Sequence, residues 1–494
     1  MAFLCLVPEN DAARAVVADP FNASFASQGV LHIGHTRPKP CGTLVTLGRG
    51  DVDIYLDSPS IARIQCSFVL DPDTHVVMLQ DLSRKWSTQV SGDKSAPFEH
   101  NRERQVVVCK ELNTRLGIGG EKKDIFQFSL HWHQDLLYTM RKVAERGKAS
   151  STMSYQENPG MARTIDEADT VAQTPRYNTR IHVPAQMAIR YIHLEGGELG
   201  SGNVGRVYKV LNVDTGKFMA LKTLIKPKGN DPGTLAKLNT SVEYALKREI
   251  EALARIRHPH IVEYVGSQGW GGLNVEIFMG LKEGTVESLV NKMVGANPTD
   301  KEASTQIVAN GVLPAMLSAL DFLAHNGIVH RDVKPANILY TTIAESDYHF
   351  QLGDFGLCNK IITAETPVGS PFYMAPEMYY GYGFQEKADV WSLYVTMLWI
   401  LDEDNYRQNL DRFAAYCEVL GAVVSAAANN SSLLQGIQEM AIQQPLLRAS
   451  AAQMLVKLRC SPTLLTTPLS CILPLVSYFR ASVLAPNPYG LSSL

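Results

Sequence analysis

The strongest constraint on this sequence is a pair of short segments in its second half, each of which places an acid beside an apolar run. HRDVKPANILY contains Asp332 and Asn337, and LGDFG contains Asp354, 22 residues after Asp332. One carboxylate can act as a general base, while a second carboxylate and an amide supply the oxygen ligands that a hard cation prefers. The pattern therefore predicts a site that combines one base with one metal ion.

A glycine-rich segment, GSGNVGRV, precedes this pair and contains Gly200, Gly202 and Gly205. Glycines at this spacing let the backbone approach a polyphosphate closely, because any Cβ atom would collide with it. The same pattern can instead open a dinucleotide-binding helix. The residues that follow indicate a hairpin around 214–216, which disfavours the dinucleotide alternative.

Lys222 lies in the apolar segment MALK, where an unpaired ammonium group would be costly to bury. Its candidate partner is Glu249, in a predicted helix around 241–257 whose apolar residues could face the core. Each residue also has a simpler interpretation, because a lysine is common at a strand edge and a glutamate is usually solvated.

The length of 494 residues leaves room for roughly two or three folded units. Residues 28–132 consist of short apolar runs separated by turn residues, which predicts a β-sandwich. The polar segment 143–187 is rich in Ser and Thr and predicts a flexible linker with candidate phosphorylation sites. An α+β unit is expected over 189–460, with strands first and helices later. Residues 461–494 are an apolar C-terminal tail that contains several prolines.

Composition and charge narrow the possible partners and location. Hydrophobic residues make up 45% and the net charge is −3, so a sizeable core is expected and nucleic acid is not expected as a partner. The eight cysteines form no C-x-x-C pair and have no histidine at ligand spacing. This disfavours disulfides and a zinc site and favours buried free thiols. No secretory signal or membrane span is expected, so the predicted location is intracellular, in the cytoplasm or nucleus.

The sequence resembles the eukaryotic protein kinase family over about 270 residues. The resemblance rests on the segments GSGNVGRV, MALK, HRDVKPANILY, LGDFG and GSPFYMAPE, in this order. The resemblance implies a bilobal α+β protein kinase fold that uses ATP and Mg²⁺. Asp332 would accept the substrate hydroxyl proton, and Lys334 would lie beside the γ-phosphate. Asn337 and Asp354 would hold the metal ion.

The resemblance also implies an ATP site. Its expected residues are Leu199, Gly200, Gly202, Gly205, Val207, Ala220, Lys222, Glu249, Met279 and Leu339. The glycines would cover the phosphates, and Lys222, held by Glu249, would bind the α- and β-phosphates. The apolar residues would enclose adenine beside the hinge after Met279.

Lys334 and the short GSPFYMAPE segment resemble Ser/Thr kinases rather than tyrosine kinases. Arg331, just before the expected base, suggests a phosphate on the following loop as its partner. The candidate phosphorylation sites are Thr363, Thr366 and Ser370, with Thr366 slightly preferred. A loop ordered by packing alone remains the alternative.

Other positions agree with the family or depart from it. Asp389 resembles a structural aspartate of the family, and Arg448 resembles the arginine that pairs with the glutamate of APE, Glu377. Gly280 and Tyr394 replace a usual Glu and Gly, and Ser370 replaces the commoner Thr. None of these departures removes a catalytic group, so they bear on inhibitor fit, substrate docking and helix packing.

The first predicted domain resembles the forkhead-associated (FHA) family, which implies an all-β FHA-like sandwich ahead of the kinase fold. The resemblance rests on Gly48-Arg49 and Asp81-Leu82-Ser83. Arg49, Ser60 and Arg63 are the candidate phosphopeptide residues, and each charge-assisted bond from an arginine would contribute about 1.5–3 kcal/mol.

The FHA pattern is altered where the family binds its peptide. The family has Ser at the position of Ala62, His at Gln65, and Asn-Gly-Thr at 85–87, where this sequence has Lys-Trp-Ser. A sandwich retained for packing alone is therefore the alternative to a phosphothreonine-binding domain.

An FHA-like domain ahead of a Ser/Thr kinase resembles the checkpoint kinases. The expected partners are protein substrates with Ser or Thr, phosphothreonine-containing proteins, and a second copy in a transient dimer, with Thr164 and Thr174 as ligands in trans. The competing function is a phosphopeptide-binding scaffold whose kinase fold binds nucleotide but turns over poorly. A small-molecule kinase is the weaker rival.

Overall fold

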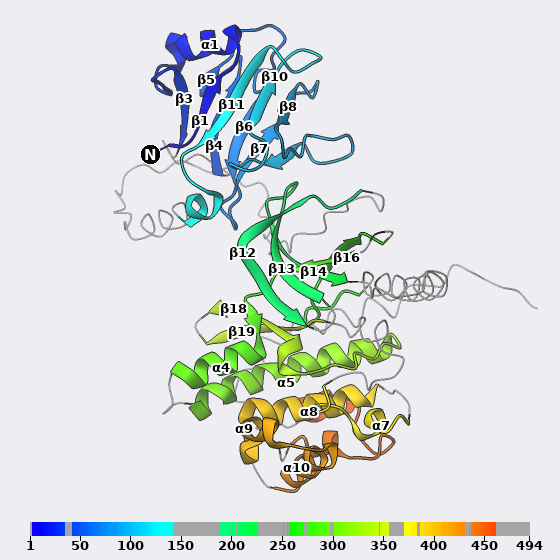
Figure 1. Cartoon of the computed structure of the whole chain (residues 1–494). Helices are drawn as coiled ribbons and strands as arrows, with labels where there is room; N and C mark the ends of the chain where they lie inside the picture. Colours follow the sequence, from blue (N-terminus) through cyan, green and yellow to red (C-terminus); the bar gives the residue numbers. More distant parts are fainter. Residues whose placement is uncertain are drawn as a thin grey trace, which may run out of the picture. The chain divides into compact units, whose positions relative to one another are not determined.

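The computed structural model divides the chain into two compact units. It describes residues 2–34, 42–141, 187–202, 205–225, 250, 254, 256–270, 272, 274–296, 301–344, 346–354, 370–382, 386–429, 434 and 436–460. The first unit comprises Met1–Thr223 and Val265–Leu281, and the second comprises Leu224–Tyr264 and Lys282–Leu494 (Figure 1). The predicted linker, the tail and most of the predicted helix around 241–257 lie outside the described residues.

One sheet of the first unit has the strand order β2–β3–β1–β11–β10–β8. Its strands are β1 (Ala2–Pro8), β2 (Ala26–Ser27), β3 (Val30–Gly34), β8 (Thr88–Ser91), β10 (Arg115–Ile118) and β11 (Phe126–Trp132). Helix α1 (Asp11–Ala18) and the 3₁₀ turn η1 (Pro20–Asn22) connect β1 to β2. The side chain of Asn10 caps α1 by accepting a bond from the Ala13 N–H at 2.9 Å, which satisfies one of the orphan donors of the first turn.

The other sheet of the sandwich has the order β5–β4–β6–β7–β9. Its strands are β4 (Thr43–Gly48), β5 (Ile54–Tyr55), β6 (Cys66–Leu70), β7 (Val77–Asp81) and β9 (Gln105–Val107). Side chains from both sheets form one apolar core, in which Phe68 and Phe128 are fully buried. The β-sandwich expected from the sequence is confirmed.

The sandwich begins before residue 28, where the sequence analysis places its start. Strand β1 lies between β3 and β11 and is antiparallel to both. Phe3, Leu4, Cys5 and Leu6 are all buried, so this strand does not show the alternation of apolar and polar residues on which strand prediction depends. The apolar run AFLCLVP was therefore missed as a strand.

A separate sheet of the first unit has the order β12–β13–β14–β16–β15. Its strands are β12 (Tyr191–Gly202), β13 (Gly205–Asn212), β14 (Phe218–Ile225), β15 (Tyr264–Gln268) and β16 (Asn274–Gly280). The predicted hairpin is confirmed, because β13 and β14 are joined at residues 213–217. The side-chain oxygen of Asn212 accepts bonds from the N–H groups of Asp214 and Thr215 and so fixes this turn.

This hairpin joins the core of the sandwich. Leu211 and Val213 belong to the same buried cluster as the sandwich residues. The N–H of Val107 in β9 donates to the carbonyl of Val213 at 2.8 Å, and the Thr74 hydroxyl donates to the Gly216 carbonyl at 2.7 Å. The sandwich and the β13–β14 hairpin therefore form one packed body.

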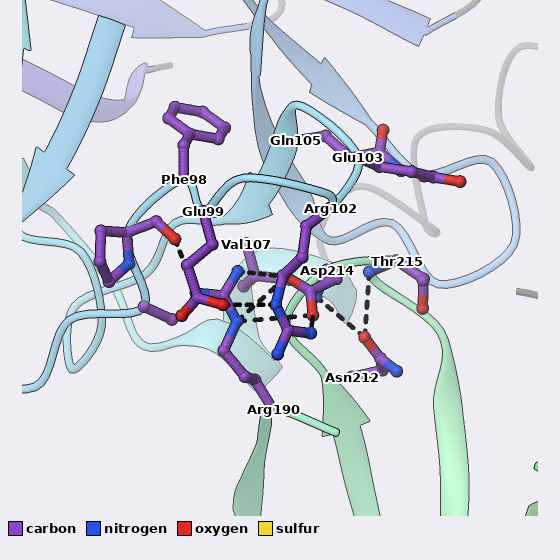
Figure 2. A network of polar contacts seen from close by, with 12 residues as sticks. Phe98, Glu99, Arg102, Glu103, Gln105, Val107, Arg190, Asn212, Asp214 and Thr215 are labelled. Carbon is purple, nitrogen blue, oxygen red and sulfur yellow. Dashed lines mark hydrogen bonds and ion pairs between the residues drawn. The ribbon is translucent and has the colours of Figure 1, made fainter. Parts of the chain in front are cut away.

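A buried ion network completes this join (Figure 2). The Asp214 carboxylate accepts bonds from Arg190 and, at 2.8 Å, from Nη1 of Arg102. Both arginines also contact Glu99, at 2.7 Å from Arg102 and 3.2 Å from Arg190. Two carboxylates thus neutralise two largely buried guanidinium groups, which belong to segments 88 residues apart in the chain.

The described residues of the second unit are mainly helical and include a small sheet with the order β17–β18–β19. Figure 1 shows α5 and α8 lying side by side at its centre. The elements are β17 (Gly284–Thr285), α4 (Val286–Ala296), α5 (Lys301–His325), η3 (Pro335–Asn337), β18 (Ile338–Ala344), β19 (Asp347–Leu352), α7 (Pro376–Tyr379), α8 (Lys387–Leu401), η4 (Glu403–Asn405), α9 (Tyr406–Asn409), η5 (Leu410–Arg412), α10 (Tyr416–Ala428), η6 (Gln438–Ala441) and α12 (Ala451–Cys460). The expected α+β class is confirmed.

Helix α5 is long and apolar enough to be a candidate membrane span, although no membrane span is expected from the sequence. It is 25 residues long, with a mean hydropathy of 1.7 over its most apolar window, and meets that criterion by length and composition. More than half of this window is buried, and its residues Val312, Met316 and Leu320 belong to the core of the second unit. Its apolarity is accounted for by a position in the middle of that core, where helices are hydrophobic on all sides.

The cysteines are only partly as expected. Five described cysteines have free thiols, of which Cys5, Cys66 and Cys109 are buried. Cys417 and Cys460 are exposed, so the expectation of burial is wrong for these two. Both lie on the solvent-facing side of helices, where a single small apolar residue costs little.

We predict that Asp214→Asn loosens the join between the sandwich and the β13–β14 hairpin. The change leaves two buried guanidinium groups with one carboxylate, and loss of one partner from such a pair costs about 3 kcal/mol or more. Hydrogen exchange measured by mass spectrometry should show about 100-fold faster exchange in the hairpin and in residues 98–107. Asp73→Asn is the control, since Asp73 is 71% exposed in its pair with Lys217 and should change exchange little.

We predict that His258 makes the second unit less stable in mild acid. Burial, and to a lesser degree His260, lowers the pKa of His258 from 6.5 to about 4. Between these pH values His258 is protonated in the unfolded chain but not in the folded chain. The free energy of unfolding therefore falls as the pH drops from about 6.5 towards 4. In His258→Asn the thermal midpoint should depend less on pH over this range, whereas the exposed control His325→Asn should keep the wild-type slope. Equal slopes in all three proteins would contradict this assignment.

Candidate active site

A buried aspartate fixes the backbone of the HRD segment. Both oxygens of Asp389, in α8, accept bonds from backbone N–H groups: Oδ2 from His330 at 2.7 Å and Oδ1 from Arg331 at 2.8 Å. Burial raises the pKa of the Asp389 carboxyl, while the charges and N–H groups of His330 and Arg331 act in the opposite direction. Arg331 has a φ of 70°, a left-handed conformation that a non-glycine residue adopts only when its surroundings hold it there.

The Asp332 carboxylate lies at the centre of a polar cluster. Its Oδ2 is 2.8 Å from Nζ of Lys334 and accepts a bond of 2.8 Å from Nδ2 of Asn337. The Asn337 amide also donates to the Asp332 carbonyl at 2.8 Å, so its nitrogen is directed towards Asp332. This places Asp332, Lys334 and Asn337 together as the sequence predicts.

Asp354 lies next to this cluster because β18 and β19 are paired. Ile338 is opposite Leu352 in the antiparallel register, and the Gly353 N–H donates to the Asn337 carbonyl at 2.9 Å. His330 Nε2 is 2.9 Å from the Gly353 carbonyl, which ties the HRD segment to the residue before Asp354. An amide oxygen and a carboxylate on adjacent strand ends are hard oxygen donors, so this pair fits Mg²⁺.

The glycine-rich segment forms the end of a hairpin in the first unit. Gly200 is opposite Val207, and Gly202 is opposite Gly205, across β12 and β13. A Cβ atom added at Gly200 would meet no protein atom within 4 Å. Protein packing therefore does not require glycine at this position, which agrees with a role in approaching a ligand.

The other expected nucleotide residues are divided between the two units. Val207, Ala220, Lys222 and Met279 lie on strands of the first unit and are half-buried, whereas Leu199 is 52% exposed. Leu339 lies in β18 of the second unit, directly after the η3 turn that contains Asn337. The structure thus groups the first set on one sheet and places Leu339 near the polar cluster around Asp332.

Three expected site residues lie outside the described residues: Glu249, Thr363 and Thr366. Their predicted roles stay predictions. Ser370 is described and is half-buried, and its carbonyl accepts a bond from the Tyr373 N–H at 3.0 Å. This bond begins the turn that leads to Ala375, Pro376 and Glu377.

The predicted pair between Glu377 and Arg448 is present. Arg448 donates from Nη1 and Nη2 to the two oxygens of Glu377 at 2.6 and 2.9 Å, and its side chain is fully buried. Its remaining N–H groups donate to the carbonyls of Ile442, Lys387 and Gln443. A buried guanidinium with all its donors paired can hold the APE segment on the helical core without an unpaired charge.

The candidate phosphopeptide residues lie on two neighbouring loops of the sandwich. Arg49, Ser60 and Arg63 are exposed. The Arg49 N–H donates to the Ala62 carbonyl at 3.1 Å, and Arg49 Nε donates to the Ile61 carbonyl at 2.6 Å. A Cβ atom at Gly48 would lie 2.3 Å from the Arg63 carbonyl oxygen, so the loops can approach only because residue 48 is glycine.

Gln65 has a structural role that the sequence analysis missed. Its Oε1 accepts a bond from the Ala62 N–H, and its Nε2 donates to the hydroxyls of Ser87 and Thr88, both at 2.9 Å. The side chain is fully buried and links the loop before β6 to the start of β8. The sequence offers one sign of this role. Ser87 and Thr88, in and beside the segment where the family pattern is altered, are two adjacent hydroxyl residues that can accept hydrogen bonds from an amide.

The fold and the cluster around Asp332 are those of the protein kinase class, and a β-sandwich precedes them. The chain matches the family described as protein kinase domain over residues 194–457, and the FHA domain over residues 45–104. The chain therefore belongs to the protein kinase family and contains an FHA domain, and a kinase domain implies the use of ATP.

Several curated proteins are similar to the kinase part of this chain. Human mitogen-activated protein kinase kinase kinase 3 is 30% identical over 288 residues, which cover 55% of this chain and 42% of that protein. Cell division control protein 7 of Schizosaccharomyces pombe is 32% identical over 222 residues, 44% of this chain and 19% of that protein. The chain thus spans less than half the length of these relatives.

A solved structure described as Rad53 1–466 in complex with AMP-PNP also resembles this chain. The similarity covers 92% of this chain and 98% of that one, with a TM-score of 0.47 and 17% sequence identity.

Proposed function

We propose that this protein is a Ser/Thr protein kinase that transfers the γ-phosphoryl group of Mg·ATP to protein hydroxyls. The main support is the Asp332 carboxylate, which is held at Oδ2 by both Lys334 and Asn337. A carboxylate fixed in this way is oriented before substrate binds, as general-base catalysis requires. Homology of the kinase part to Ser/Thr kinases supports the same function.

The chemistry follows from which oxygen of Asp332 is already bonded. Because Lys334 and Asn337 hold Oδ2, we assign the other oxygen, Oδ1, to accept the proton of the substrate hydroxyl. Lys334 is cationic and only 2.8 Å from this carboxylate, so it would also face charge that develops on the transferred group. The Asp389 bonds keep the preceding backbone in place during transfer.

Mg²⁺ would be held by the Asn337 side-chain oxygen and the Asp354 carboxylate. When bound, the ion would neutralise charge on the ATP phosphates. The glycine-rich hairpin would cover the phosphates, Lys222 would bind them, and Val207, Ala220 and Leu339 would enclose adenine. These roles rest on the family pattern and on the space at Gly200.

Two other functions compete with this one. A phosphopeptide-binding scaffold would bind nucleotide and transfer little phosphate, and the complete set Lys222, Asp332, Asn337 and Asp354 argues against it. A small-molecule kinase is disfavoured because the GSPFYMAPE segment resembles a protein-substrate docking surface.

We predict that Asp332→Asn abolishes most phosphate transfer by the full chain. A positioned base contributes about 10²–10⁴-fold, so the rate should fall by that factor while nucleotide binding is retained. The measurement is transfer of radiolabelled γ-phosphate to a generic Ser/Thr protein and to the chain itself, with and without Mg²⁺. The exposed variant Asp347→Asn is the matched control and should keep the wild-type rate.

The outcomes separate the functions. Transfer that is dependent on Mg²⁺ and lost in Asp332→Asn supports the kinase, and mapping of autophosphorylated residues tests Thr363, Thr366 and Ser370. A wild-type protein that binds ATP but transfers nothing, even after treatment with an activating kinase, favours the scaffold.

We also propose that the FHA domain binds phosphothreonine through Arg49, Ser60 and Arg63. The two arginines lie on loops that are joined by backbone bonds, so both guanidinium groups can be presented on one end of the sandwich. Partners would be phosphorylated proteins or a second copy of this chain. The free thiols of the five described cysteines support an intracellular location.

We predict that fluorescent peptides around phosphorylated Thr164 and Thr174 bind the full chain, and that unphosphorylated peptides do not. Arg49→Ala or Arg63→Ala should weaken binding about 10-fold or more, as expected for loss of a charge-assisted bond. Arg14→Ala, an exposed arginine in α1, is the control. Equal binding by wild type and both loop variants would show that the sandwich serves a different purpose.

A further inference from the structure

Three strands of the sandwich bring Cys5, His32 and His133 together on one face. Strand β1 lies between β3 and β11, and Cys5 is directly opposite His32 in the β1–β3 register. On the other side Cys5 is opposite His131, so His133, two residues further, has its side chain on the same face. The His133 N–H donates to the Phe3 carbonyl at 3.2 Å, which continues the pairing of the strands up to this residue.

The ring nitrogens of both histidines face the sulfur atom. Cys5 Sγ is 3.2 Å from Nδ1 of His32 and 3.1 Å from Nε2 of His133. A neutral thiol has one proton and can donate it to only one of these nitrogens. The second nitrogen can then contact the sulfur only by donating its own N–H in a weak hydrogen bond, whereas a cation bound by all three atoms accounts for both contacts in the same way.

We propose that Cys5, His32 and His133 bind a Zn²⁺ ion. The three candidate ligand atoms lie within 4.8 Å of one another. With Zn–S of about 2.3 Å and Zn–N of about 2.0–2.1 Å, a tetrahedral ion needs S–N separations of about 3.5 Å, so small side-chain rotations would suffice. One thiolate with two imidazoles is a donor set that zinc prefers over Mg²⁺ or Ca²⁺.

The burial of the three residues is suited to an ion with an open position. Cys5 is buried, His32 is half-buried and His133 is exposed. Water can therefore supply the fourth ligand from the side of His133, and the thiol proton is released to solvent when the ion binds.

The sequence alone disfavours a zinc site because these ligands are not close together in the chain. Cys5 and His32 are 27 residues apart, and Cys5 and His133 are 128 apart. Zinc motifs are recognised by short spacing within a turn or hairpin, whereas here strand pairing supplies the proximity. An ion at this position would tie the first strand of the sandwich to its last.

The test is cobalt binding by the full chain, purified without a histidine tag and kept reduced with a phosphine. Co²⁺ in this site should give the visible bands of a tetrahedral ion and a thiolate-to-cobalt charge-transfer band, at one ion per chain, and Zn²⁺ should displace it. Cys5→Ser should remove the charge-transfer band, and His133→Ala should weaken binding about 10-fold or more. His133 is exposed, so its variant is expected to fold even where Cys5→Ser does not.

Cys417→Ser and His100→Ala, which change an exposed cysteine and an exposed histidine elsewhere, should bind as wild type does. Zn²⁺ should also raise the thermal midpoint of wild type and not that of His133→Ala, because an ion bound only by the folded state stabilises it. The proposal is overturned if wild type gives no thiolate band, or if the band and its affinity are unchanged in Cys5→Ser and His133→Ala.

Discussion

The arrangement of Asp332, Lys334 and Asn337 depends on one buried carboxylate, that of Asp389. Asp389 accepts hydrogen bonds from the backbone N–H groups of His330 and Arg331, and these bonds help to hold Arg331 at a φ of 70°. That conformation turns the chain so that Asp332 is presented to Lys334 and Asn337. Burying this carboxylate is costly, as its raised pKa reflects, and the two N–H bonds offset part of that cost. The backbone strain at Arg331 and the cost of burying the Asp389 carboxylate therefore both accompany one conformation of the loop that carries Asp332.

A similar balance of charge joins the sandwich to the first kinase strands. Asp214 and Glu99 neutralise Arg102 and Arg190, while apolar residues such as Leu211 and Val213 complete a common core. The apolar contacts stabilise the join without a preferred direction, whereas the ion pairs, which are directional, fix its register. The FHA domain is thus part of the same folded body as the β13–β14 hairpin, although a flexible linker was the expected connection between them.

The motif residues could be predicted from the sequence because their spacing is local. Asp332, Lys334 and Asn337 lie within six residues, and β18–β19 pairing adds Asp354, so short-range patterns were sufficient. Contacts made by distant segments could not be predicted. Strand β1 has no alternation because it is buried on both faces, and the Arg102–Asp214 pair joins residues 112 apart. Gln65 illustrates the same limit. In the sequence it is recognised only as a residue that replaces the family's histidine, because its bonds to Ser87 and Thr88 form only when the sandwich brings these segments together.

The segment from Glu99 to Arg104 contacts two different parts of the first unit, the kinase strands and the loop that contains Trp86. Arg102 binds Asp214 at the kinase strands, whereas Arg104, two residues later, pairs with Asp81 and lies 5.5 Å from the ring of Trp86. Trp86 belongs to the segment that replaces the family's Asn-Gly-Thr at the peptide-binding end. Arg102 and Arg104 are only two residues apart, so the contacts to the altered loop and to the kinase strands are made by one short segment of backbone. The altered FHA pattern therefore has a structural consequence apart from peptide affinity, since Trp86 supplies an aromatic surface against which Arg104 is held.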